Sequence, residues 1–226
     1  MRMLGIIQCR SASTRLPGKA HLPLRGRTVL EWVMARALRC AALDRVVVAT
    51  TDRPEDDAVA ARAESAGLEV FRGDSGDVLS RYVGVLERFP AEGVVRITAD
   101  NPLTDPATVD GVVRIFREGG HDFAYAARVP YGCGADAFRA DLLRAAARES
   151  KDPRHQEHIN TWFLDNHLRC RIGFLEPGPG RERPDVRVTL DTPEDLRVLC
   201  ALFDVLDDPE SCGLDEIIAA YESLRA

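Results

Sequence analysis

Apolar and polar residues alternate in blocks along the first part of the chain. A short apolar run, 4–7, leads into a polar loop, 8–19. Apolar residues then recur at helical spacing on one face, at Leu30, Val33, Met34, Ala37, Leu38 and Ala41. A second apolar run, 45–50, precedes a helix with Pro54 in its first turn, and a third run covers 68–71. The order strand, helix, strand, helix, strand predicts an α/β fold with a doubly wound, mostly parallel sheet.

The second half of the chain is less regular. The expected elements are strands at 94–98 and 122–127, a glycine-rich loop at 129–138, a helix at 139–148, a loop at 176–184 and a strand at 186–190. Thr192, Pro193 and Asp195 form a good helix start, and two helices would then close the core up to Ala226. We therefore predict a single domain over 1–226, with a small α+β elaboration at about 120–185.

Three cations, Arg10, Arg15 and Lys19, lie in the first polar loop beside Ser11 and Ser13. In an open α/β sheet, a loop at the carboxyl end of a strand is where ligands bind. Buried cations are costly without anions, so these side chains are either solvated or arranged around several negative charges. The chain has 30 Lys plus Arg but only two lysines, and a lysine kept in this loop indicates a compact charge for phosphate. We favour a polyphosphate site over an exposed basic loop.

Asp100 follows the strand expected at 94–98, so it should lie at the carboxyl end of the sheet, on the same edge as the cationic loop. A carboxylate beside a polyphosphate suits Mg²⁺, although the sequence Asp-Asn-Pro also forms ordinary turns. Asp105 is accounted for as a helix cap. Asp191 follows the strand expected at 186–190 and precedes the cap residue Thr192, so the helix start does not account for it.

Composition excludes several classes of protein. The net charge of −6 argues against a general nucleic-acid-binding protein, which is usually basic. The six cysteines are scattered without a C-x-x-C pair, so we expect reduced packing residues and neither disulfides nor a zinc site. No apolar run has the length of a membrane span, and too few apolar residues precede Arg10 for a secretory signal. We expect a cytoplasmic protein with no membrane partner.

The run Arg10-Ser-Ala-Ser-Thr-Arg-Leu-Pro-Gly-Lys19 resembles the nucleotide-binding loop of the cytidylyltransferases that activate acidic sugars, the CMP-sugar synthetases. The similarity extends to about Leu196 and is greatest to the SpsF-like spore-coat-polysaccharide branch. The resemblance implies a nucleotide-diphospho-sugar transferase-like fold, CTP as a substrate, and Asp100 and Asp191 as ligands of Mg²⁺. It is compatible with a homodimer.

The resemblance also places two further segments at the site. A segment containing Arg72 and Asp77 lies along the nucleotide in the family, but a glycine turn and a helix capped by Asp77 explain it nearly as well. For the acceptor, the resemblance indicates Asp136, where the family usually carries glutamate.

The acceptor stretch of the family, usually Arg-Glu-His, corresponds to Gln156-Glu157-His158, and His155 precedes it. The loss of the arginine leaves the acceptor open. These residues lack the i, i+4 spacing of a helical zinc motif, and an exposed helix surface accounts for them about equally well.

Together these features predict an Mg²⁺-dependent nucleotidyltransferase that moves CMP from CTP to an acidic sugar or another small acidic acceptor and releases pyrophosphate. Arg10, Arg15 and Lys19 would neutralise the phosphates. GTP, or a phosphate or phosphonate acceptor, would fit the same loop. A glycosyltransferase-like nucleotide-sugar enzyme is the main alternative, although Asp100 is not part of a D-x-D pair. A nucleotide-binding regulator without turnover would not need Asp191.

Overall fold

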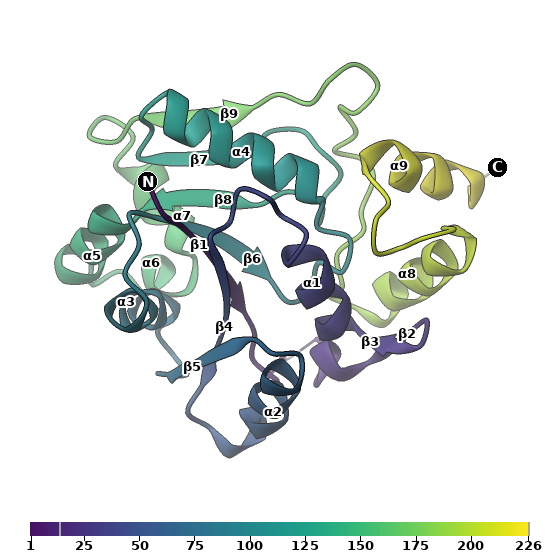
Figure 1. Cartoon of the computed structure of the whole chain (residues 1–226), viewed down its shortest axis with the longest axis horizontal. Helices are drawn as coiled ribbons and strands as arrows, with labels where there is room; N and C mark the ends of the chain where they lie inside the picture. Colours follow the sequence, from purple (N-terminus) through teal and green to yellow (C-terminus); the bar gives the residue numbers. More distant parts are fainter. Residues whose placement is uncertain (14, 226) are drawn as a thin grey trace.

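The computed structural model describes residues 1–13 and 15–225, so Thr14 of the predicted loop and Ala226 lie outside the described residues. Strand β1 (Met3–Gln8) is apolar on both faces and lies inside a seven-stranded sheet of order β5-β4-β1-β6-β8-β7-β9 (Figure 1). The other strands are β4 (Arg45–Thr51), β5 (Glu69–Gly73), β6 (Gly93–Thr98), β7 (Phe123–Ala126), β8 (Asp136–Arg139) and β9 (Ile172–Leu175). Among the described strands of this seven-stranded sheet, only β8 runs antiparallel to its neighbours. The predicted doubly wound, mostly parallel sheet is confirmed.

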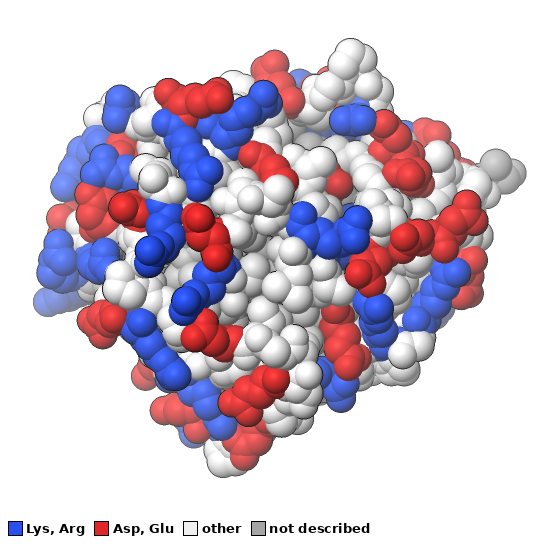
Figure 2. Space-filling model, viewed as in Figure 1, with Lys and Arg blue, Asp and Glu red and all other residues white. Residues whose placement is uncertain are grey.

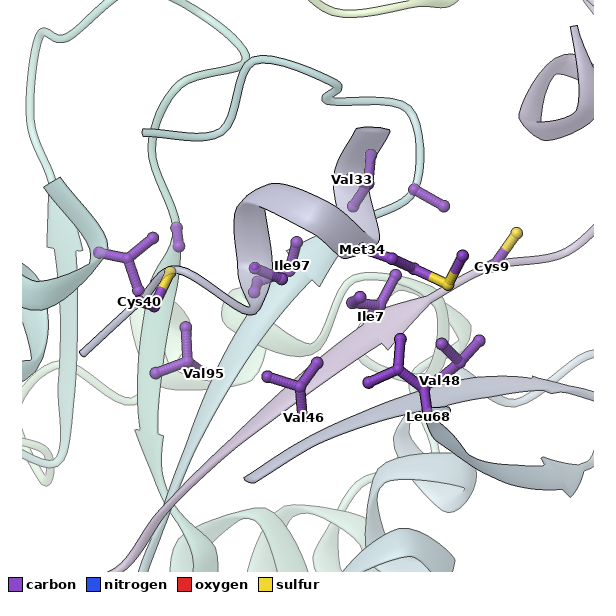
Figure 3. Close-up of a cluster of buried hydrophobic side chains, with 14 of the residues drawn as sticks. Ile7, Cys9, Val33, Met34, Cys40, Val46, Val48, Leu68, Val95 and Ile97 are labelled. Atoms are coloured by element: carbon purple, nitrogen blue, oxygen red, sulfur yellow. The ribbon is translucent and has the colours of Figure 1, made fainter. Parts of the chain in front are cut away.

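Helices cover both faces of this sheet. Met3 and Ile7 of β1 point to one face, and Leu4 and Ile6 point to the other. The first face is covered by α1 (Val29–Ala37), α2 (Asp57–Ser65) and α4 (Pro106–Glu118). The second is covered by α3 (Val78–Arg88), α5 (Ala140–Glu149) and α7 (Ile159–Asp165). In Figure 3, Met34 of α1 points toward Ile7 on β1, so this helix packs against the first face of the sheet.

A third apolar cluster joins the end of the chain to its beginning. Helix α8 (Pro193–Val205) lies beside the small hairpin of β2 (Pro23–Leu24) and β3 (Arg27–Thr28) in Figure 1, and α9 (Leu214–Ser223) packs against α8. Trp32 of α1 packs edge-on against Phe203 of α8, with ring centroids 5.1 Å apart. Three short helices complete the description: η1 (Lys19–His21), η2 (Pro54–Asp56) and α6 (Pro153–Glu157).

Three sequence predictions about local structure are wrong. The loop expected at 129–138 ends in a strand, because Asp136 to Phe138 belong to β8 and pair with both β6 and β7. The strand expected at 186–190 is extended but lies outside the sheet. Its backbone bonds go to Tyr131 and Asp100. Helix α1 ends at Ala37, so Leu38 is exposed and does not reach the core face, and Ala41 is exposed too.

Basic and acidic side chains are interspersed over the face shown in Figure 2. Across residues 1–13 and 15–225, no helix combines the length and the apolar character that crossing a membrane requires. The six cysteines are free, and five of them are buried, as expected for packing residues.

Candidate active site

A cavity of about 1160 Å³ opens at the carboxyl ends of β1 and β6, where Gln8 and Thr98 line it. The cationic loop contributes Arg10, Ser13, Arg15 and Lys19 to its wall. Asp100, Asp191 and the loop around Tyr131 form a second wall, and Glu157 to Thr161 a third. Segments far apart in the sequence therefore meet at one edge of the sheet, as the parallel topology requires.

Lys19 holds the two candidate metal ligands together. Its Nζ donates to Asp100 Oδ2 over 2.7 Å and to Asp191 Oδ1 over 3.0 Å. A third hydrogen bond, of 2.8 Å, goes to the carbonyl of Leu190. Because Asp100 Oδ2 and Asp191 Oδ1 both bond to the same nitrogen, the distance between them cannot exceed the sum of these two hydrogen-bond distances. This is shorter than the roughly 8 Å beyond which a single ion with ~2.1 Å bonds could not bridge them.

Asp191 is the most strongly enclosed carboxylate of this group. Arg15 pairs with its Oδ1 over 3.0 Å, and Arg187 pairs with its Oδ2 over 2.9 Å. Burial alone would raise the pKa of Asp191, but the hydrogen bond and charge of Lys19, with Arg187 and Arg15, outweigh it and the pKa is lowered. Asp191 is therefore ionised at neutral pH and surrounded by cations.

Arg10 connects the loop to the third wall of the cavity. Its guanidinium donates to Glu157 Oε1 over 2.8 Å, and both side chains are about two-fifths exposed. His158 lines the same wall, whereas His155 does not line the cavity. His155 lies between Ser150 and Asp165, at 2.7 Å from the Ser150 hydroxyl and 2.8 Å from Asp165 Oδ2. In the predicted acceptor stretch, Glu157 and His158 therefore line the cavity, whereas His155 holds α6 in place through its contacts with Ser150 and Asp165.

The base of the cationic loop is fixed from behind by Asp56. The Ser11 amide donates to Asp56 Oδ1 over 2.6 Å, and the Thr51 hydroxyl donates to its other oxygen. Burial would raise the pKa of Asp56, but the hydrogen bonds from Thr51 and Ser11 lower it. Ser11 is not among the cavity-lining residues, and its hydroxyl lies 3.3 Å from His21 Nε2. Among the described serines of the loop, Ser13 is the one that lines the cavity.

A partly buried polar network lines the cavity at Gln8, Arg96 and Asp136. Arg96 NH1 donates to Asp136 Oδ2 over 3.0 Å, and its Nε donates to Gln8 Oε1 over 3.3 Å. Tyr82 also donates to Gln8 Oε1, over 3.0 Å. Burial raises the pKa of Asp136, and the charge of Arg96 counteracts this. Asp136 is therefore partnered by an arginine and reaches the cavity as half of an ion pair.

The segment at 72–77 contributes little to the cavity directly. Arg72 pairs with Asp57 over 2.6 Å and donates to two backbone carbonyls, and it lines neither described cavity. Asp77 caps α3 by accepting from the Ser80 amide over 2.8 Å, as the sequence predicted. The capped-helix interpretation therefore accounts for what Asp77 does in this structure.

Sequence reasoning missed several residues of the site, among them Asp56, Arg81, Arg96 and Arg187. One of them carried a signal. Arg81 falls on the apolar face of α3, beside buried Val78 and Tyr82, where a charged side chain is uncommon. The others depend on contacts between distant segments, which no local pattern reveals.

Among the described residues, no three His, Cys, Asp or Glu side chains are grouped as a closed metal site. Mg²⁺ does not require one, since it is commonly held by one or two carboxylates with phosphate oxygens and water. Asp100 and Asp191 supply two hard oxygen ligands beside a cationic cavity, so the donor set fits this ion.

Comparisons with known proteins identify relatives of this chain in sequence and in structure. A family model described as cytidylyltransferase matches residues 4–222. The spore coat polysaccharide biosynthesis protein SpsF of Bacillus subtilis is 32% identical over 221 residues, covering 96% of this chain and 92% of that protein. A cytidylyltransferase structure from Leptospira borgpetersenii superposes with a TM-score of 0.93 at 27% identity, covering 100% of this chain and 95% of the other. The CMP:2-keto-3-deoxy-manno-octonic acid synthetase complexed with CTP shares the fold, with a TM-score of 0.70 at 22% identity and coverage of 90% and 99%.

Proposed function

Since this chain belongs to the cytidylyltransferase family and is a nucleotidyltransferase, we propose that it transfers CMP from CTP to an acidic sugar, with Mg²⁺ and with release of pyrophosphate. The observation that carries the proposal is the meeting of Lys19, Asp100 and Asp191 at the edge of a cavity lined by cations. In such a site, carboxylates that can bind a metal ion are in direct contact with cations that can bind a triphosphate.

In the proposed reaction, an acceptor oxygen attacks the α-phosphorus in line and the bond to the β-phosphate oxygen breaks. Protein side chains need only position the groups and neutralise charge. Arg15 is two-thirds exposed and pairs with Asp191, so it can exchange this carboxylate for a phosphate oxygen at little cost. Lys19 is mostly buried, and it would stay between the carboxylates and the phosphates. Arg10, whose partner Glu157 is also exposed, would bind the nucleotide from the other side of the loop.

Bound Mg²⁺ would supply a positive charge that polarises the α-phosphate and orients the acceptor oxygen. Asp100 and Asp191 would hold it. In the structure each oxygen of Asp191 accepts from a cation, so the ion competes with Lys19, Arg15 and Arg187 for this carboxylate. Mg²⁺ affinity should therefore be weak until a nucleotide draws the cations to its phosphates.

The acceptor is assigned to the walls that hold His158 and the Arg96–Asp136 pair. A related protein supports an acidic sugar: the CMP:2-keto-3-deoxy-manno-octonic acid synthetase that shares the fold. His158 lines the cavity but pairs with no carboxylate among the described residues, so it is free to contact an acceptor. His158→Ala should raise the KM for the acceptor and leave CTP binding unchanged.

The proposal is tested by pyrophosphate release. The wild-type protein is incubated with each of CTP, GTP, UTP and ATP, with MgCl₂ or with excess EDTA. The acceptors are 2-keto-3-deoxy-manno-octonic acid, N-acetylneuraminic acid and a small phosphonate acid. We expect release with CTP and an acidic sugar that EDTA abolishes. Release with GTP or with the phosphonate acid would favour the corresponding variant of the reaction. Activity with a nucleotide-sugar donor, and none with any triphosphate, would support the glycosyltransferase alternative.

A further inference from the structure

The cations that line the cavity differ in their partners. Each of five is paired with a carboxylate: Arg10, Arg15, Lys19, Arg96 and Arg128. Arg81 lines the same cavity, yet no carboxylate within residues 1–13 and 15–225 forms an ion pair with it. Unpaired cations are expected on the surface, where water solvates them. Arg81 is instead among the most buried charged residues of the protein, with 2% of its surface exposed.

The hydrogen bonds of Arg81 leave donors unused. Its NH1 donates to the carbonyl of Asp74, while its Nε is buried with no partner in the described structure. The stem of the side chain lies against Gly73, where a Cβ atom would approach Arg81 Cγ to 3.2 Å. Burial is the main cause that lowers the pKa of the guanidinium, and the charge of Arg10 lowers it further. A buried guanidinium held in place with free donors beside a cavity indicates a ligand that accepts hydrogen bonds.

Arg81 lies away from the end of the cavity where the reaction is proposed to take place. Lys19, Asp100 and Asp191 mark that end, next to β6. Helix α3, which carries Arg81, packs against β4 and β5 on the other side of β1, and also against α5 and against α6, which ends at Glu157. Arg10 lies between the two, because it belongs to the phosphate loop and its NH1 also lies 3.5 Å from the carbonyl of Ser75, just before α3. Because the loop and Arg81 line one cavity, a nucleotide whose phosphates bind the loop has room for its nucleoside beside α3.

We propose that Arg81 binds the base of the nucleotide and distinguishes cytosine from uracil. A guanidinium has only donors, so it requires a base edge that carries two adjacent acceptors. Cytosine offers O2 and N3 as such an edge, whereas uracil presents a donor at N3. Arg81 therefore favours CTP over UTP because the wrong base leaves buried donors unpaired and places two N–H groups against each other. The inference rests on the proposed function for the class of ligand, and it adds the residue that distinguishes the base.

Calorimetric titration of the Arg81→Met variant with CTP, UTP and inorganic tripolyphosphate tests this role without an acceptor or turnover. We expect the affinity for CTP to fall by about ten- to a hundredfold, the loss of a charged hydrogen bond. UTP binding should change little, so the preference for CTP should largely disappear, and tripolyphosphate should bind as it does to the wild type. Arg88→Met, an exposed arginine on the same helix, serves as the matched control and should bind all three like the wild type.

Each other outcome contradicts the inference. An equal loss for CTP, UTP and tripolyphosphate would make Arg81 a phosphate ligand or a structural residue. If Arg81→Met does not fold, the Arg81→Lys variant, which keeps the charge but not the paired donors, is titrated instead and must lose the preference for CTP. A wild-type protein that prefers UTP would also overturn the inference. The proposed function can fail independently of this inference. In that case the protein would bind CTP in preference to UTP but would release no pyrophosphate with any acidic acceptor.

Discussion

At the scale of single residues, the candidate site is a balance of charges around Lys19. The ammonium group is shared by two carboxylates, and two arginines, Arg15 and Arg187, pair with one of them, Asp191. Arg10 pairs separately with Glu157 on another wall of the cavity. Such a site carries ligands for both signs of charge at once. It can receive a metal ion and a polyphosphate together more readily than either alone.

Replacement of Lys19 by alanine should weaken CTP binding by about 1.5–3 kcal/mol, the value of a charged hydrogen bond. The fold should remain, since Lys19 and its two carboxylate partners, Asp100 and Asp191, line the cavity and do not belong to the apolar core. Calorimetric titration with CTP measures the effect, and circular dichroism checks the fold. The exposed Lys151→Ala variant is the control, because it is the only other lysine in the chain. Unchanged CTP affinity in Lys19→Ala would remove Lys19 from the nucleotide site.

Asp56 is predicted to act on the loop without touching the nucleotide. Asp56→Asn leaves one acceptor where the Ser11 amide and the Thr51 hydroxyl now share a carboxylate, so the loop loses a charged hydrogen bond. We expect the KM for CTP to rise several-fold and the melting temperature to fall. Exposed Asp57→Asn, one residue away, should change neither by a comparable amount. Equal effects from the two variants would show that the position of Asp56 behind Ser11 has no special importance.

The sequence predicted the residues of this site that follow a strand or a turn and missed those that need tertiary contacts. Asp100 and Lys19 could be placed because strand order and loop position depend on local pattern. The contact of Asp136 with Arg96 could not be foreseen, since it arises from an antiparallel strand in a segment that reads as a glycine-rich loop. The site roles of all these residues remain predictions until variants are measured.

At the scale of elements, the segment before α8 has the greatest influence on the site. Residues 186–190 are apolar and β-branched enough to predict a strand, but their backbone groups pair with Tyr131 and Asp100 instead of joining the sheet. Leu190 donates to the carbonyl of Asp100 over 2.8 Å, which draws Asp191 next to Asp100. The two carboxylates therefore meet through a loop contact, and not through neighbouring strands as the sequence suggested.

The start of α8 fixes Asp191 from the other side. Asp195 accepts from the amides of Asp191 and Thr192 and pairs with Arg187. Burial would raise its pKa, but these hydrogen bonds lower it from 3.8 to about 2. Because the folded pKa lies below the unfolded one, the stabilisation is present above about pH 4 and is lost as the pH falls toward 2.

Asp195→Ala should therefore destabilise the protein by about 1.5–3 kcal/mol at neutral pH. Urea denaturation at a series of pH values measures the difference from the wild type, which should shrink below pH 4. Glu194→Ala is the control, since Glu194 is an exposed neighbour paired only with Arg197 and such surface pairs contribute little. A difference between wild type and Asp195→Ala that does not depend on pH would show that the carboxylate charge is not what stabilises this helix start.

At the scale of the whole molecule, one antiparallel strand joins the regular first half to the less regular second half. Phe138 of β8 lies between Phe123 and Phe163, with ring centroids 5.0 and 5.1 Å apart. Through β8 the elaboration at about 120–185 shares the core of the sheet and brings Asp136 and His158 to the cavity. The predicted elaboration is thus packed into the same sheet as the nucleotide loop.

Phe138→Ala should lower the free energy of unfolding by about 3–5 kcal/mol, the usual cost of removing a buried aromatic ring. Phe174→Ala is the matched control, because Phe174 lies on edge strand β9 and is about half exposed. Urea denaturation of both variants gives the comparison. A loss below 1 kcal/mol for Phe138→Ala would contradict the insertion of β8 into the common core.

The account as a whole depends on Asp100 and Asp191 acting as one metal-binding pair for nucleotidyl transfer. Asparagine at either position keeps the size and removes the charge. We measure pyrophosphate release and CTP affinity for the wild type, Asp100→Asn and Asp191→Asn at saturating MgCl₂, with Asp105→Asn, which replaces the cap residue of α4, as the control. We expect turnover to fall by about a hundredfold or more in the first two variants, while CTP affinity stays within a few-fold of the wild type. Turnover close to that of the wild type in either variant would contradict this expectation.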